Sequence, residues 1–143
     1  MIFQGMMAFF ATLGFGILFH VPNKYLLYLS LIGMFGGIAY EISAFYFGIT
    51  IALFIASFLI SLLSELAARY LHCPTSLFLL CALVPLVPGG LMYKTVLAII
   101  NEEYTQAFMD GIATLSGACA IVMGCTLVTS IFLMLRNKKM CKK

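Results

Sequence analysis

Five long stretches of this chain contain almost no charged side chains, and this feature limits its fold more than any other. One uncharged stretch covers residues 2–19, and another covers residues 111–135. A helix of this length reaches across the roughly 30 Å hydrocarbon core of a bilayer at about 1.5 Å per residue. Only 9% of the residues are charged, against about 25% in soluble domains. This small number of charged side chains cannot cover a water-exposed surface. We therefore expect the outside of the folded chain to face lipid.

The spacing of the stretches predicts an all-α integral membrane protein with about five transmembrane helices in a single domain. The expected spans are residues 2–19, 25–40, 44–71, 76–100 and 111–135, followed by a basic tail at residues 136–143. The first stretch has no basic start and no cleavage site of the A-x-A kind, so we expect a retained helix. Only residues 41–43 separate the second and third stretches, which leaves open an arrangement of four spans with one long bent helix.

The distribution of charge predicts the orientation of the spans. Five of the eight basic side chains lie in the C-terminal tail. With five spans, this tail and the loops that carry Lys24 and Arg69 fall on one side of the membrane. Glu41 and the acidic loop at residues 101–110 fall on the other side. Since basic residues mark the cytoplasmic side, we expect the N-terminus outside and the C-terminus in the cytoplasm.

The fourth stretch is interrupted near its middle by Pro-Leu-Val-Pro-Gly-Gly at residues 85–90. Pro85 and Pro88 break the helix, because proline has no amide proton and its ring clashes one turn back. The freed backbone groups cannot face lipid and need protein or a water-filled cavity. A half-helix that restarts near Gly89 and Gly90 presents unpaired amides, which suit a carboxylate. We therefore expect a substrate pathway here, and the alternative is a kink that serves packing alone.

Tyr93 and Lys94 follow this break and extend the candidate pathway. Lys94 is the only basic residue at the expected membrane depth, where an ammonium group needs an anionic partner. Tyr93 beside it offers a hydroxyl group. The alternative is a lysine that snorkels to the interface, with its stem along apolar surface.

Three residues near the end of the third stretch are expected to have a structural or interface role. Glu65 and Arg69 stand four apart on one helix face, and their ion pair is expected to end the span at the interface. An intramembrane charge site is the alternative. Pro74 restricts the residue before it, so we expect it to end this helix and begin the next.

Small residues recur four apart in the second and fifth stretches. The pairs are Gly33 and Gly37, Ala113 and Gly117, and Ala120 and Gly124. Small residues at this spacing lie on one helix face and let another helix approach closely. We therefore expect close helix contacts at these positions.

Several function classes find no support in the sequence. The five cysteines form no CxxC pair, and the two histidines lack partners at ligand spacing, so we expect no metal and no cofactor. The glycines before Lys94 do not have the spacing of a phosphate-binding loop. The basic residues are too few and too scattered for a nucleic-acid surface. No paired carboxylates or nucleophile motif indicates an enzyme.

The chain resembles a known family over nearly its whole length. Arg69, Pro74 and residues 84–90 are similar to the arginine, proline and Pro-Leu-Val-Pro-Gly pattern of the bacterial threonine/serine exporter (ThrE-like) family, and in particular of its small YjjB-like membrane subunit. The layout matches from residues 11–19 to the fifth span, and Pro-Leu-Val-Pro-Gly is the specific part. The family pattern carries over onto Arg69, Pro74, Pro85, Pro88 and Gly89, whereas roles for Tyr93 and Lys94 are inferred from this sequence alone.

The resemblance implies one part of a secondary exporter that works with a larger YjjP-like subunit in the bacterial cytoplasmic (inner) membrane. Its substrate would be a small carboxylate-bearing metabolite, which is threonine or serine in some family members and succinate, a dicarboxylate, in others. The sequence contains no ATP-binding motif, so an ion gradient is the expected driving force. The alternative function is a non-transporting membrane scaffold or assembly subunit. The sequence leaves open whether the assembly is a homo- or hetero-oligomer.

Overall fold

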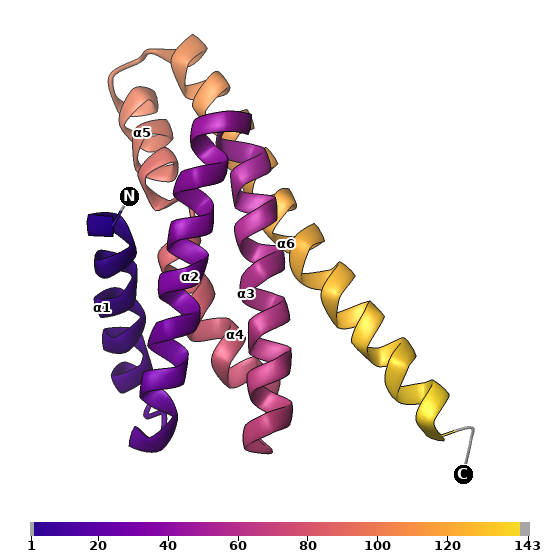
Figure 1. Cartoon of the computed structure of the whole chain (residues 1–143). Coiled ribbons are helices and arrows are strands. Elements are labelled where there is room, and N and C mark those ends of the chain that lie inside the picture. The colour runs from indigo at the N-terminus through magenta and orange to yellow at the C-terminus, as the bar shows by residue number, and fades with distance from the viewer. Residues whose placement is uncertain (1, 141–143) are drawn as a thin grey trace.

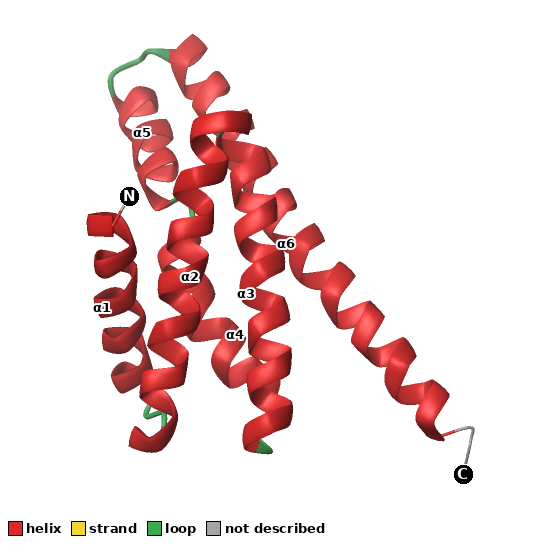
Figure 2. Cartoon of the chain, viewed as in Figure 1, coloured by secondary structure: helices red, strands yellow, loops and turns green. Residues whose placement is uncertain are grey.

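The structure, a computed structural model, describes the backbone of residues 2–140 and the side chains of residues 5–134. In this part of the chain all regular structure is helical (Figure 2). The elements are α1 (Ile2–Leu18), α2 (Asn23–Phe47), α3 (Ile49–Leu71), α4 (Thr75–Leu83), a short 3₁₀ helix η1 (Val84–Leu86), α5 (Gly89–Ile100) and α6 (Tyr104–Met140).

Three of these helices, α2, α3 and α6, are long and apolar enough to cross a membrane. The helix formed by α4 and η1 is followed by α5 at a bend of 47°, and counting this pair as one span raises the number to four. Helix α1 is apolar and has 17 residues, which is about the shortest length that spans a bilayer. The fold is therefore all-helical with three or four long apolar helices, as in a membrane protein.

The boundary between α2 and α3 differs from the sequence-based prediction. Residues 41–43 lie inside α2, because nothing in Glu41, Ile42 or Ser43 opposes a helical backbone. The chain turns instead at Gly48, whose φ of 83° lies in a region that glycine adopts at no steric cost. Glu41 is therefore a helix residue, although the orientation argument placed it in a loop.

Both ends of the last helix also differ from the expected span. Helix α6 begins at Tyr104, before the predicted start at residue 111, and its backbone is helical to Met140. The acidic connection is consequently short and lies between Ile100 and Tyr104. Residues 141–143 of the predicted basic tail lie outside the described residues.

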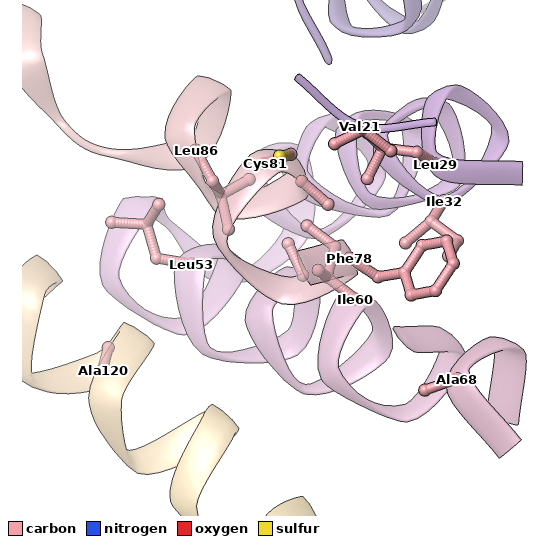
Figure 3. Packing of buried hydrophobic residues seen from close by; sticks show 12 residues of the cluster. Val21, Leu29, Ile32, Leu53, Ile60, Ala68, Phe78, Cys81, Leu86 and Ala120 are labelled. Carbon is pink, nitrogen blue, oxygen red and sulfur yellow. The ribbon is translucent and has the colours of Figure 1, made fainter. Parts of the chain in front are cut away.

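Helices α2, α3 and α4 enclose the core of the molecule. Phe78 of α4 is fully buried among Leu29 and Ile32 of α2 and Ile60 of α3 (Figure 3). The ring of Phe78 meets the ring of Tyr25 edge-on, with 6.1 Å between their centroids. In a membrane, where lipid tails are as apolar as leucine, such packing contacts hold the helices together.

Glycines bring neighbouring helices close to α2 and α3. A Cβ atom placed on Gly124 would lie 2.9 Å from the carbonyl oxygen of Phe54 and 3.0 Å from the amide nitrogen of Phe58. A Cβ atom on Gly33 would overlap the side chain of Thr12 in α1. The close helix packing expected at these two glycines is therefore confirmed.

Helix α5 lies apart from the main bundle. Within the described residues it packs against α6 and against no other helix. Figure 1 shows α5 above α1, and it shows the second half of α6 leaving the side of α3. The connection between α4 and α5 is thus the place where the chain leaves the core and enters the α5–α6 pair.

Candidate functional site

The segment between α4 and α5 is held in a tight, non-helical turn. After η1, Val87 is extended, with φ −60° and ψ 131°. Pro88 follows with φ −74° and ψ 56°, values typical of an inverse γ-turn. The turn is closed by the amide of Gly89, which donates to the carbonyl oxygen of Val87 at 2.7 Å. The two prolines therefore redirect the chain over only two non-helical residues.

Helix α5 begins without a side-chain cap. Pro88 occupies the N-cap position, and no side chain there accepts a hydrogen bond from the helix. The first amide of α5 that reaches a carbonyl one turn back is that of Met92, which donates to Pro88 at 3.2 Å. The amides of Gly90 and Leu91 therefore have no acceptor within the helix. Free amides at a helix start, together with the helix dipole, suit a carboxylate or another anion.

A cavity of about 240 Å³ lies against this helix start. Residues 85–91 form one wall, and the other wall consists of Tyr40 from α2 with Ile49 and Leu53 from α3. The volume is smaller than the roughly 300–1,000 Å³ that is common for drug-sized ligands. A cavity of this size suits a small metabolite.

A second cavity, of about 320 Å³, lies on the other side of the break among α1, α2, α3 and α4. Three residues line both cavities, namely Tyr40, Pro85 and Leu86. Among all residues that line these two cavities, only Tyr40 has a side chain with a hydroxyl, amide or charged group. Tyr40, Pro85 and Leu86 therefore form the wall between the two cavities, and Tyr40 supplies its polar group.

The predicted pathway residues fall into two groups in the structure. Pro85, Pro88, Gly89 and Gly90 line the cavity at the start of α5. Tyr93 and Lys94 are exposed on α5 and line neither cavity beside the break. Tyr93 and Lys94 each lie one helical turn further along α5 than Gly89 and Gly90, about 6 Å along the helix axis.

Tyr40 was not among the residues selected from the sequence. The sequence predicts the end of the second span at Tyr40, whereas the structure places this residue inside α2. The available signal was its spacing, because Gly33, Gly37 and Tyr40 follow one another at intervals of four and three on one helix face. A polar aromatic residue that continues a glycine stripe lies at a helix contact and not at the lipid surface.

Glu65 and Arg69 form the ion pair that the sequence predicted, near the end of α3. The distance from Arg69 Nε to Glu65 Oε2 is 3.7 Å, which is longer than a hydrogen bond. The guanidinium group lies over the ring of Phe132 of α6, 4.4 Å from the ring centroid. Its Nη2 atom donates to the carbonyl oxygen of Phe132 at 3.5 Å. Arg69 therefore connects α3 to α6.

A third cavity, of about 380 Å³, surrounds this ion pair, and we call it the Glu65–Arg69 cavity. Its lining includes Thr75 at the start of α4 and Thr129 and Phe132 of α6. Pro74 is the N-cap residue of α4, with φ −65°, and it does not line the cavity. No sequence pattern points to Thr129 or Phe132, because their proximity to Arg69 depends on the packing of α6 beside α3.

The described residues offer little for a metal. No group of three or more histidine, cysteine, aspartate or glutamate side chains among them could hold a metal ion. Cys73, Cys81, Cys119 and Cys125 are all free thiols. The polar groups at the sites described here are the backbone amides at the start of α5, the hydroxyl groups of Tyr40, Thr75 and Thr129, the Cys73 thiol and the Glu65–Arg69 pair.

The fold and its cavities define a class: a multi-pass helical membrane protein with spaces for a small molecule beside an interrupted helix. A family model described as Threonine/Serine exporter, ThrE, matches residues 4–131. The chain therefore belongs to the threonine/serine exporter family, a family of transporters and not of enzymes. The resemblance noted in the sequence is confirmed by this match. No solved structure matches the chain.

Proposed function

We propose that this chain is the small subunit of a two-component secondary exporter for threonine, serine or a related small carboxylate-bearing metabolite. Membership of the exporter family supports transport. The observation that carries the proposal is the start of α5, where the uncapped amides of Gly90 and Leu91 adjoin a cavity of about 240 Å³. Such a site binds a carboxylate without any basic side chain.

The proposed topology has five spans, formed by α1, α2, α3, the α4–α5 pair and α6. Helix α1, with 17 residues, reaches about 25 Å and crosses where the bilayer thins around it. Lys24 in the first turn of α2 and Arg69 in the last turn of α3 lie at the same end of this antiparallel hairpin. Glu102 and Glu103 lie in the connection at the other end. The rule that basic residues stay inside then puts the N-terminus outside and the C-terminus in the cytoplasm of a bacterial cell.

Transport in this proposal takes the substrate past the wall formed by Tyr40, Pro85 and Leu86. The substrate carboxylate accepts hydrogen bonds from the amides at the start of α5, and the Tyr40 hydroxyl contacts the same substrate. Movement of the interrupted segment connects the two cavities, so that the substrate passes from one to the other. Broken helices move in this way in other secondary transporters. An ion gradient drives the cycle, because the chain has no ATP-binding motif.

The larger YjjP-like subunit covers α5 in this proposal. Helix α5 packs only on α6 within the described chain, and Lys94 on its exposed surface would otherwise face lipid at a cost of about 3 kcal/mol. Side chains on a helix lean toward its N-terminus, so the Lys94 ammonium group leans toward the break and away from the nearer membrane surface. We assign it an anionic partner, either on the larger subunit or on the substrate, with Tyr93 beside it.

The proposal is tested by efflux from cells that contain labelled threonine, serine or succinate. One set of cells expresses this chain alone, a second expresses it with the larger subunit, and a control set expresses neither protein. The presence of each expressed protein in the membrane is verified. We expect efflux of at least one substrate only when both chains are present. Absence of efflux for all three substrates would instead favour a scaffold or assembly subunit.

A further inference from the structure

We infer that the Glu65–Arg69 cavity binds the ammonium and carboxylate groups of a hydroxy α-amino acid. The inference rests on the proposed export function and adds a second site to it. This cavity shares no lining residue with the two cavities beside the break. It therefore is a separate site, at the end of the bundle where α3 ends.

The cavity brings together two opposite charges that are only loosely paired. The contact of 3.7 Å between Arg69 Nε and Glu65 Oε2 exceeds the 2.7–3.2 Å that is typical, as an approximate range, of a hydrogen bond. Arg69 has five N–H donors and Glu65 has two acceptor oxygens. Apart from the 3.5 Å bond to Phe132, the described contacts leave most of this capacity available. Both groups can therefore bind a ligand without first breaking a strong pair.

This arrangement fits a zwitterion better than a dianion. An α-amino acid carries its carboxylate and its ammonium group on the same carbon atom, so the two charges lie close together. The carboxylate can meet Arg69 while the ammonium group meets Glu65, one helical turn away. Succinate has only negative groups, so one of them would be repelled by Glu65. The cavity therefore favours an amino acid over a dicarboxylate.

Phe132 prepares Arg69 for this role. The guanidinium carbon lies over the ring of Phe132, 4.4 Å from its centroid, as in a cation–π contact. Of the five N–H donors of the group, one donates to the carbonyl oxygen of Phe132, and the others can donate to a carboxylate. Arg69 is thus held in place by α6 while its donors remain open to the cavity.

Two threonines extend the fit to serine and threonine. Thr75 and Thr129 line the cavity. The hydroxyl of Thr129 donates to the carbonyl oxygen of Cys125 at 2.9 Å, so it keeps lone pairs that can accept a further bond. The hydroxyl group of a bound serine or threonine can donate to it. A substrate without a hydroxyl group would lack this contact.

The position of the cavity suits the direction of export. Lys24 and Arg69 lie at this end of the α2–α3 hairpin, and the proposed topology places this end at the cytoplasm. A substrate that leaves the cell enters from this side. The Glu65–Arg69 cavity would therefore load the amino acid before its carboxylate reaches the start of α5.

Binding of labelled threonine and of labelled succinate to the purified two-subunit complex in lipid nanodiscs tests the inference. We expect Glu65→Gln and Arg69→Gln each to weaken threonine binding by about tenfold or more, because each removes a charge-assisted hydrogen bond. Glu65→Gln should also reduce the preference for threonine over succinate. The matched control is Glu102→Gln, which neutralises an exposed carboxylate in the acidic connection. It should change neither the threonine affinity nor the preference for threonine over succinate.

A purely structural role of the pair makes a different prediction. Loss of a structural ion pair lowers the melting temperature but leaves the ratio of threonine to succinate affinity unchanged. If a single variant does not assemble, the double variant Glu65→Gln with Arg69→Gln removes both charges and leaves no unpaired one. Wild-type threonine affinity and an unchanged ratio in these variants would overturn the inference.

The outcome can be separated from that of the proposed function. Replacing Pro88 and Gly89 by alanine should abolish efflux and leave threonine binding at the Glu65–Arg69 cavity intact. Threonine binding that needs Glu65, without efflux by the wild-type complex, contradicts the export proposal and supports the binding site. Efflux by the wild-type complex with the same half-saturating threonine concentration in Glu65→Gln and Arg69→Gln contradicts the binding site alone.

Discussion

Replacement of Pro88 and Gly89 by alanine would join α5 to the helical segment before it. Proline and glycine are about 3 and 1 kcal/mol less favourable than alanine inside a helix, so the double substitution favours the continuous form by about 4 kcal/mol. Helix α5 has 12 residues and is about 18 Å long. Removing the whole 47° bend would move its far end by about 14 Å, as follows from this length. In the joined helix the amides of Gly90 and Leu91 pair with carbonyls one turn back, and the carboxylate site is lost.

We expect this variant to insert normally into the membrane and to lose threonine efflux in cells that also contain the larger subunit. Slower hydrogen exchange at residues 90 and 91 would report that their amides have become paired. The control is Pro22→Ala, which removes a proline from the connection before α2 and leaves the break unchanged. Wild-type efflux in a variant whose residues 90 and 91 are protected from exchange would refute the role of the interrupted helix.

Three further outcomes follow from the structure. Tyr40→Phe should keep the wall between the two cavities but lower threonine affinity in efflux assays by about fivefold, as expected for one lost hydrogen bond, whereas Tyr40→Ala should open the wall and allow larger amino acids to pass. Gly124→Ala should lower the stability of the protein in detergent by about 1–3 kcal/mol, because the added methyl group meets backbone atoms of α3; Gly14→Ala, which meets open space, should not. A thiol probe applied to intact cells should label a cysteine placed at Glu103 and leave Cys141 unmodified, and the reverse pattern would contradict the proposed orientation.

The helical nature of the chain was predictable from sequence because long apolar runs admit few other structures in lipid. Helix ends were harder to predict. Glu41 and Ser43 suggested a boundary, yet Gly48, inside an apolar region, is where the chain turns. A single polar residue does not end a helix, whereas a turn over one residue needs a backbone that permits positive φ. Gly48 is the only glycine between Gly37 and Gly89, but an isolated glycine in an apolar run does not by itself predict a helix end.

The sites were predictable only where residues close together in sequence form them. Residues 85–90 were identified because two prolines so close together interrupt any helix. The second wall of the cavity at the start of α5 includes Tyr40 and Leu53, which are distant in sequence from residues 85–91. Only the packing of α2 and α3 brings them to this cavity. The same holds for Phe132 beside Arg69. Spacing within one helix predicted the Glu65–Arg69 ion pair, but the local sequence does not indicate that α6 lies next to this pair.

The turn at Gly48 also determines how the transporter is anchored. Because one residue joins α2 to α3, the two helices form a hairpin that inserts into the bilayer as a unit. Its tip carries three exposed aromatic residues, Phe45, Tyr46 and Phe47, and tyrosine side chains prefer the boundary between lipid tails and headgroups. In the proposed membrane arrangement these side chains hold the hairpin, and Tyr40 with it, at a fixed depth. The motion in the proposed transport cycle then belongs to the α4–α5 segment, which moves against a stationary hairpin.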